Sequence, residues 1–108
     1  MSTLAPLRVL HNLTQLYEHG FRDTVTDVTL LKIASSQAAR DRVVLRDLEH
    51  DLRDLEQRYQ LSSDEFFRRW QAGEMPDTAD FMEWNVLYQM ALEVQERLQL
   101  LQSRVEAQ

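Results

Sequence analysis

The stretch SSDEFFRRWQAGEMPDTADFMEW, residues 62–84, interrupts a chain that otherwise carries leucine at helical spacing. It opens with the pattern of a capping box, in which we expect the Ser62 hydroxyl to accept a hydrogen bond from the Glu65 amide and the Glu65 side chain to reach back to the Ser62 amide. Gly73 favours a helix stop and Pro76 prevents continuation. The stretch therefore predicts a short helix between two longer ones, the second capped by Asp77 or Thr78.

Apolar residues follow alternating steps of three and four on both sides of this insert, which is typical of coiled-coil helices. The seam before the insert has one polar member, Asp41, among Leu31, Ala34, Ala38, Leu45, Leu48, Leu52, Leu55 and Tyr59. The seam after the insert consists of Trp84, Leu87, Ala91, Val94, Leu98, Leu101 and Val105. A polar seam residue either fixes register or strand number, or lies in a frayed turn that faces solvent. For Asp41 both interpretations stay open.

A third leucine-rich segment lies near the N-terminus. Pro6 suits the first turn of a helix and Gly20 a left-handed cap at its end. Thr24 or Thr26 is expected to cap the helix that follows. The leucines of this segment are three residues apart, at Leu7, Leu10, Leu13 and Leu16.

These segments predict an all-α fold in one domain: a long antiparallel, coiled-coil-like helical hairpin with a short tip helix and an N-terminal helix. Two seams and the N-terminal helix present more apolar surface than one hairpin hides, so we expect a homodimer. Parallel pairing of the seams and pairing across subunits stay open. The expected helices cover residues 4–19, 25–60, 63–72 and 78–106.

Composition and motifs argue against several function classes. The 108 residues carry a formal charge of −6 and no cysteine. No apolar run approaches the roughly 20 residues of a membrane span, and the N-terminus lacks signal-peptide features, so we expect a cytoplasmic protein. Gly-rich phosphate loops, metalloprotease motifs and nucleophile elbows are absent, so we expect no enzyme and no cofactor.

Metal and nucleic-acid binding are poorly supported. Asp47 and His50 would share a helix face, but a bundle metal site needs a second such motif on a facing helix, so no metal is expected. The basic cluster of Arg40, Arg42 and Arg46 is diluted by neighbouring acids, whereas a DNA-binding domain shows a basic stripe. We therefore expect no direct nucleic-acid binding.

Aromatic and acidic residues concentrate in and around the insert. The rings either seal the hairpin tip as a small core or form an anchor patch for a partner protein, and both can hold for different rings. Six acids and no basic residue lie between Arg69 and Arg97, which is typical of a face that attracts a basic partner or of a solvated helix surface. Our candidate anchors are Trp70, Phe81 and Trp84, and our candidate steering charges are Glu74, Asp77, Asp80 and Glu83.

Four segments of the chain follow one another in a fixed order: LYEHGF (16–21), TDVTLLKI (26–33), AARDRVVLRDLEHDLRDLEQRY (38–59) and then the insert. It resembles small helical bacterial proteins paired with TumE-type toxins. In that family a heptad helix ends in Tyr and is followed by S-x-E-E-F-x-x-x-x-x-A-G-E, an acidic turn and D-F-x-E-W. The matching positions are Tyr59, Ser62, Asp64, Glu65, Phe66, Ala72, Gly73, Glu74, Asp80, Phe81, Glu83 and Trp84.

One departure from the family pattern is Met75-Pro76-Asp77, where a more acidic turn without proline is expected. The resemblance implies an antitoxin that neutralises a small toxin by binding it. The alternative function is a dimeric coiled-coil adaptor or assembly subunit that has no toxin partner.

Overall fold

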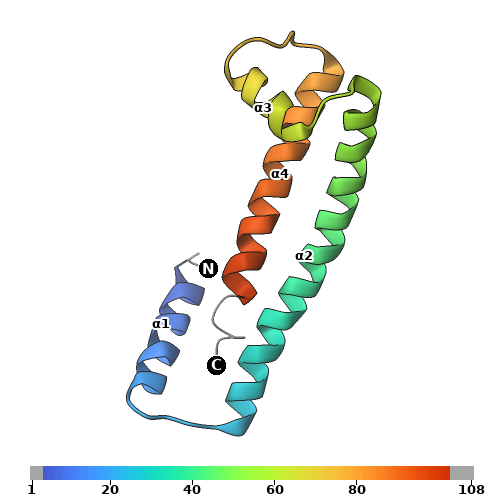
Figure 1. The fold of residues 1–108 in the computed structure, drawn as a ribbon. Coiled ribbons are helices and arrows are strands. Elements are labelled where there is room, and N and C mark those ends of the chain that lie inside the picture. The colour runs from blue at the N-terminus through green and yellow to red at the C-terminus, as the bar shows by residue number, and fades with distance from the viewer. Residues whose placement is uncertain (1–3, 103–108) are drawn as a thin grey trace. The chain divides into compact units, whose positions relative to one another are not determined.

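The computed structural model describes residues 4–102 and shows an all-α fold (Figure 1). The described part contains, in chain order, α1 (Ala5–Glu18), α2 (Thr24–Tyr59), α3 (Ser63–Gln71) and α4 (Ala79–Gln102). Every described helix end lies within one residue of the predicted one, and residues 103–106 of the last predicted helix lie outside the described residues. The predicted fold class, a helical hairpin with a short tip helix and an N-terminal helix, is confirmed.

The chain divides into two compact units at Ile33. We call the first the N-terminal unit; it holds α1 and the beginning of α2. We call the second, from Ala34 onward, the hairpin unit; it holds the rest of α2 together with α3 and α4. No helix in the described residues is long and apolar enough to cross a membrane.

In the hairpin unit, α2 and α4 lie side by side in opposite directions (Figure 1). Asp41 of α2 pairs with Arg97 of α4, and Arg58 of α2 pairs with Asp80 of α4. The two pairs are 17 positions apart on each helix, so the register is constant between them. In this register the last described residue of α4, Gln102, lies opposite residue 36 of α2.

The predicted seams form the core of the hairpin. The buried apolar residues of the stem are Ala38, Leu48, Leu52, Leu55, Ala91, Val94 and Leu98, and Leu45, Leu87 and Leu101 pack partly buried against them. Leu31, the first member of the predicted seam, is 55% exposed and lies outside this core. Val105 lies outside the described residues.

Asp41 is buried inside this seam, with only 2% of its surface exposed. Arg97 donates to both carboxylate oxygens of Asp41 at 2.8 Å, and Gln37 donates to one of them at 3.0 Å. These hydrogen bonds, those from Arg97 first, keep the pKa of the Asp41 carboxyl below its usual value. The frayed-turn interpretation of Asp41 is therefore wrong, and its pairing with Arg97 marks one register of the hairpin.

Each of α1, α2 and α3 is followed by a residue in the left-handed conformation. After α1, the amides of Gly20 and Phe21 donate to the carbonyls of Tyr17 and Leu16, with Gly20 at φ +98°, as predicted for a left-handed cap. Equivalent bonds close α3, where Gly73 has φ +74°. At the end of α2 the left-handed position is occupied by Gln60, with φ +52°.

In the N-terminal unit, Tyr17 connects α1 to the beginning of α2. Its hydroxyl donates to Asp27 at 2.5 Å, and this bond raises the pKa of Tyr17 to about 12. The carboxylate of Asp23 accepts from both the amide and the hydroxyl of Thr26. Asp23 therefore caps α2, and the prediction that Thr24 or Thr26 would do so was wrong because an acceptor one position earlier already occupies the cap.

Candidate partner-binding surface

The tip of the hairpin is built around two stacked rings. Phe66 of α3 and Trp84 of α4 are fully buried, with ring centroids 4.1 Å apart and planes inclined by 3°. The indole N–H of Trp84 donates to the buried Ser63 hydroxyl at 2.8 Å. This bond satisfies both polar groups inside an apolar core, so the tip joins α3 and α4 as one packed body.

Local hydrogen bonds place α3 on this core. The Ser62 hydroxyl accepts from the Glu65 amide at 3.1 Å, as the capping box predicts. The reciprocal half of the box was predicted wrongly, because Glu65 accepts hydrogen bonds from Arg68 and Arg69 instead. These bonds, with Arg68 first, lower the pKa of Glu65 from 4.5 to about 2.

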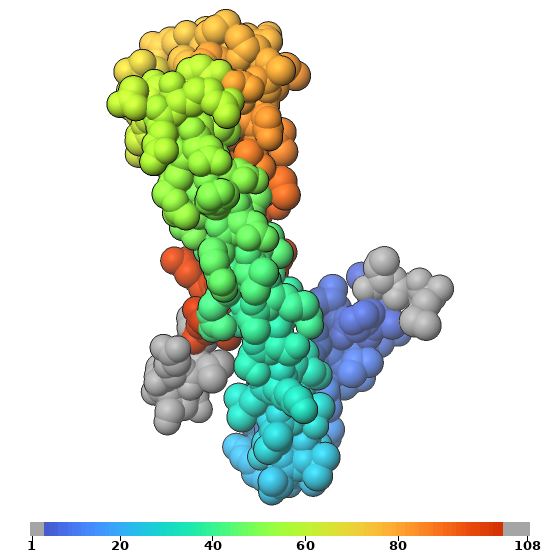
Figure 2. All heavy atoms as spheres, turned by 90° about the vertical axis from the view of Figure 1, so that its right-hand side faces the viewer, coloured from blue at the N-terminus to red at the C-terminus, as the bar shows by residue number. Residues whose placement is uncertain are grey.

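The start of α3 is also tied to α2. Glu56 accepts from the amide of Ser63 at 2.8 Å. At the other end of the connection, the Thr78 hydroxyl accepts from the Phe81 amide at 3.2 Å and so caps α4, one of the two predicted alternatives. Figure 2 shows the side chains of α3, the connection and the start of α4 packed into one continuous mass at this end of the hairpin.

Two of the candidate anchors lie inside this body. Trp84 is fully buried, and Phe81 is buried between the rings of Phe66 and Tyr59. Neither ring offers a surface that a partner can cover while the tip is folded. Their place in the structure is the small core that seals the hairpin, which was the other interpretation of the aromatic cluster.

Trp70 is the candidate anchor that stays partly accessible. Its ring packs at the edge of the tip core, 5.8 Å from Phe66, and the side chain is half-buried. Tyr and Trp side chains at such edges combine apolar area with a polar group, which is why they are common at binding hot spots.

Three of the four candidate steering charges are exposed at the tip: Glu74 and Asp77 on the connection between α3 and α4, and Glu83 on the second turn of α4. Within residues 4–102, Asp77 and Glu83 take part in no hydrogen bond or ion pair of the structure. Their charges therefore face solvent without local compensation.

The fourth, Asp80, is engaged by α2. Arg58 donates to its carboxylate at 2.9 Å, and the Tyr59 hydroxyl donates to the same oxygen. These two bonds, with Tyr59 first, lower the pKa of Asp80. The sequence shows no basic residue near Asp80, but the fold brings one from 22 positions away. Asp80 therefore holds the tip to the stem and is paired with a cation of α2.

A groove that the sequence did not indicate lies beside the tip, with a volume of about 340 Å³. Its walls come from α2, the first turn of α3 and α4, and its acidic lining residues are Glu49, Glu56 and Asp64. Tyr88 reaches across it to Asp64 at 3.3 Å, and burial followed by the charge of Asp64 raises the pKa of Tyr88. The spacing of residues along any one helix could not predict this groove, because its lining residues come from three helices.

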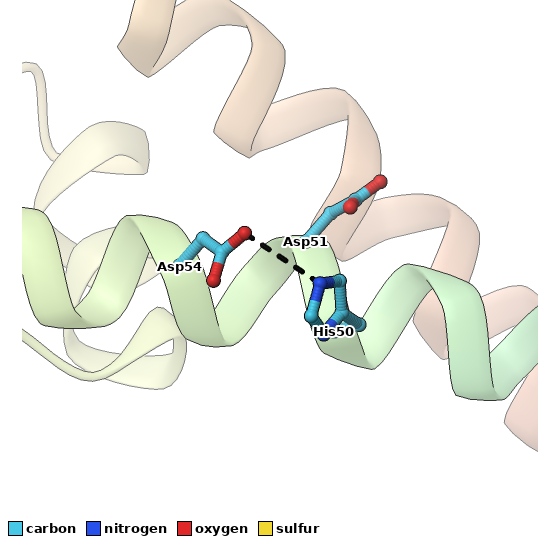
Figure 3. A group of neighbouring side chains, drawn as sticks. All are labelled: His50, Asp51 and Asp54. Carbon is cyan, nitrogen blue, oxygen red and sulfur yellow. Dashed lines mark ion pairs between the residues drawn. The ribbon is translucent and has the colours of Figure 1, made fainter.

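A cluster of potential metal ligands lies on the stem, where His50, Asp51 and Asp54 project from one stretch of α2 (Figure 3). His50 Nε2 lies 3.8 Å from an Asp54 oxygen, and all three side chains are exposed. The sequence paired His50 with Asp47, which is not part of this group. Metal sites in helical bundles take ligands from facing helices, whereas here a single helix supplies the whole group.

A scan against protein-family models and searches of curated proteins and of solved structures gave no match to this chain.

Proposed function

We propose that the protein is a non-catalytic protein–protein interaction module, the antitoxin of a bacterial toxin–antitoxin pair, and that it neutralises its toxin by direct binding. The resemblance described above supports this proposal, since it extends over most of the chain. A cytoplasmic location and a small basic partner belong to the same proposal.

The observation that carries the proposal is the combination of exposed acids and a half-buried Trp70 on a packed tip. Glu74, Asp77 and Glu83 face solvent, whereas the core beneath them is closed by the stacked Phe66 and Trp84. A surface that is ordered before it binds loses little conformational entropy on association, so its contacts contribute more fully to affinity.

The proposed mechanism assigns different roles to the charges and the ring. The three acids speed up the encounter with a basic surface, as complementary charges do at protein interfaces. Trp70 supplies apolar contact area once the partner is docked. A toxin that acts on nucleic acid needs basic residues to hold phosphates, so an acidic tip that covers them blocks the substrate site.

The second candidate function, a dimeric coiled-coil adaptor, is favoured by a different observation. The N-terminal unit leaves large apolar side chains exposed on both of its helices. Such a surface suits assembly with another helical protein or a second copy, and it needs no toxin.

A growth assay with the product of any short reading frame that adjoins this one separates the two functions. If the neighbour is a toxin, its expression alone should arrest growth and co-expression of this chain should restore it. Replacing Glu74, Asp77 and Glu83 by Lys should abolish rescue. The matched control replaces Asp47, Asp51 and Glu96, which are also exposed but lie away from the tip, and should still rescue.

Asp80 is left unchanged in both variants, because its bonds to Arg58 and Tyr59 belong to the fold. A neighbour that is not toxic, together with purification of this chain without a small basic protein, would contradict the antitoxin proposal and favour the adaptor. Rescue by the tip variant would contradict the assigned binding surface.

A further inference from the structure

The face of α1 is wider than α2 can cover. With 3.6 residues per turn, Leu7 and Leu16 lie on opposite edges of a leucine face that spans half of the helix circumference. Near the middle of this face Leu13 and Tyr17 are half-buried, whereas Leu10 beside them and the edge residues Leu7 and Leu16 are exposed. None of the 14 residues of α1 is buried.

The apolar face of α1 is not sufficiently buried to account for the stability of this helix. Isolated helices shorter than about 12–15 residues are marginal in water, so most of the stability of α1 must come from packing of its apolar face. On this face, only Leu13 and Tyr17 are even half-buried. The remaining face calls for a further apolar surface.

A groove shows where that surface can dock. It has a volume of about 420 Å³ and runs between α1 and α2, lined by Leu10, Leu13, Thr14, Tyr17, Glu18 and Leu30. Leu7, one helical turn before Leu10, extends the apolar wall beyond the groove and is 63% exposed. The unit therefore presents both a groove and a row of exposed leucines, Leu7 and Leu10, which we call the leucine ridge.

We propose that a second copy of this chain occupies this surface, so that two N-terminal units form the core of a homodimer. In a two-fold arrangement the leucine ridge of each protomer packs into the groove of the other. The residues of the interface are then the same on both sides, as in isologous dimers.

The charge distribution favours a second copy as the occupant. Residues 4–33 carry three basic and three acidic side chains, so the N-terminal unit has no net charge. The whole net charge of −6 lies on the rest of the chain, where it disfavours contact between two copies. Self-association is therefore least opposed at the N-terminal unit.

The exposed area also agrees with a dimer. The unit exposes between 38% and 74% of ten large apolar side chains: Leu4, Leu7, Val9, Leu10, Leu16, Phe21, Val25, Val28, Leu31 and Ile33. At roughly 60–120 Å² for a whole aliphatic side chain, these hold roughly 300–600 Å² of apolar surface per protomer. If a second copy covered all ten, then with about 65% apolar area in homodimer interfaces two protomers would form an interface of at most roughly 900–1,800 Å². Stable interfaces bury roughly 1,200–2,000 Å².

Sedimentation of the full chain at nanomolar to micromolar concentration tests this assignment. The wild-type protein should sediment as a dimer at micromolar concentration, and the combined Leu7→Glu and Leu10→Glu variant as a monomer. Leu100→Glu is the matched control, because Leu100 is 72% exposed on α4, and it should leave the dimer intact. Both tryptophans lie in the hairpin unit, so their fluorescence checks that the hairpin of each variant is folded.

Cross-linking supplies a second measurement that does not depend on destabilising a helix. The chain has no cysteine, so a single introduced thiol reports on its own position. Leu7→Cys should give a covalent dimer with a short bifunctional thiol reagent, whereas Leu100→Cys should not. A wild-type monomer at micromolar concentration, or efficient cross-linking at position 100 with none at position 7, would overturn the proposal. Neither result bears on the tip surface, which lies in the hairpin unit.

Discussion

Gln60 adopts a left-handed conformation, the single such case among the non-glycine residues that the structure describes. At its φ of +52° a residue with a side chain is strained, whereas glycine adopts this conformation without that strain. Gln60→Gly should therefore raise the free energy of unfolding by about 0.5–1 kcal/mol, measured by urea denaturation. Gly73→Ala, at φ +74° in the equivalent position after α3, should lower it by a similar amount. A loss of stability in Gln60→Gly would mean that the 2.7 Å bond from Gln60 to the Gln57 carbonyl outweighs the backbone cost.

Asp41 and Arg97 are an asymmetric pair, because the carboxylate is buried and the guanidinium is half-exposed. Arg97→Gln leaves a buried carboxylate without its main donor, whereas Asp41→Asn leaves an arginine that can still reach water. Arg97→Gln should therefore lower the thermal midpoint more than Asp41→Asn at neutral pH. Equal effects of the two changes would contradict a buried, charged Asp41.

At the scale of elements, the short helix α3 is held by the ring stack and by the bond from Trp84 to Ser63. Trp84→Ala removes both and should cost about 3–5 kcal/mol, in the range found for large aromatic residues in cores. Met82→Ala, on the exposed side of the same helix, should change stability far less. Urea denaturation of both variants, followed by circular dichroism, measures the difference. Equal losses would contradict a closed tip core.

The hairpin should also lose stability in acid. Asp41, Glu65 and Asp80 have folded-state pKa values below their ordinary ones, because Arg97, Arg68 and Tyr59 respectively donate to them. Groups with lowered pKa contribute stability above their unfolded pKa and lose it as the pH falls through the folded one. For Glu65 this window runs from 4.5 to about 2. Thermal midpoints should therefore be level near neutral pH and fall below about pH 4.5, and a flat profile down to pH 2 would contradict these bonds.

Sequence reasoning predicted what depends on neighbours within a few residues. The caps at Ser62, Gly73 and Thr78 and the seam period are of this kind, because hydrogen bonds and helical faces repeat over three or four positions. It missed contacts between distant positions. The contacts of Arg58 with Asp80 and of Glu56 with the Ser63 amide follow from how the helices pack. The reciprocal half of the capping box is the local exception, because Arg68 and Arg69 compete for the Glu65 carboxylate.

The candidate site shows the same division. The sequence indicated that rings and acids gather at the tip, which the fold places together. The prediction kept Trp84, which is fully buried, beside Trp70 as a candidate anchor, because both follow apolar helical spacing. Accessibility depends on which helix covers which face, and that is a property of the packed tip.

At the scale of the whole molecule, we propose that the tip of the hairpin unit binds the partner and that the N-terminal unit forms the dimer. The hairpin unit carries the net charge and the acidic tip, and the N-terminal unit, which has no net charge, carries a large exposed apolar surface. Disruption of the dimer by Leu7→Glu and Leu10→Glu should therefore leave the affinity of each tip for its partner unchanged, as measured by calorimetry per protomer. A matching loss of partner affinity would contradict this separation.

The central claim is that the acidic tip binds a small basic protein. The most direct test is the association rate between this chain and the purified product of the adjoining reading frame, measured at low and high salt. The account predicts that lysine at positions 74, 77 and 83 slows association at least tenfold at low salt, and that high salt removes most of the difference. The control with lysine at 47, 51 and 96 should stay close to the wild type. Unchanged association of the tip variant at low salt would contradict the claim.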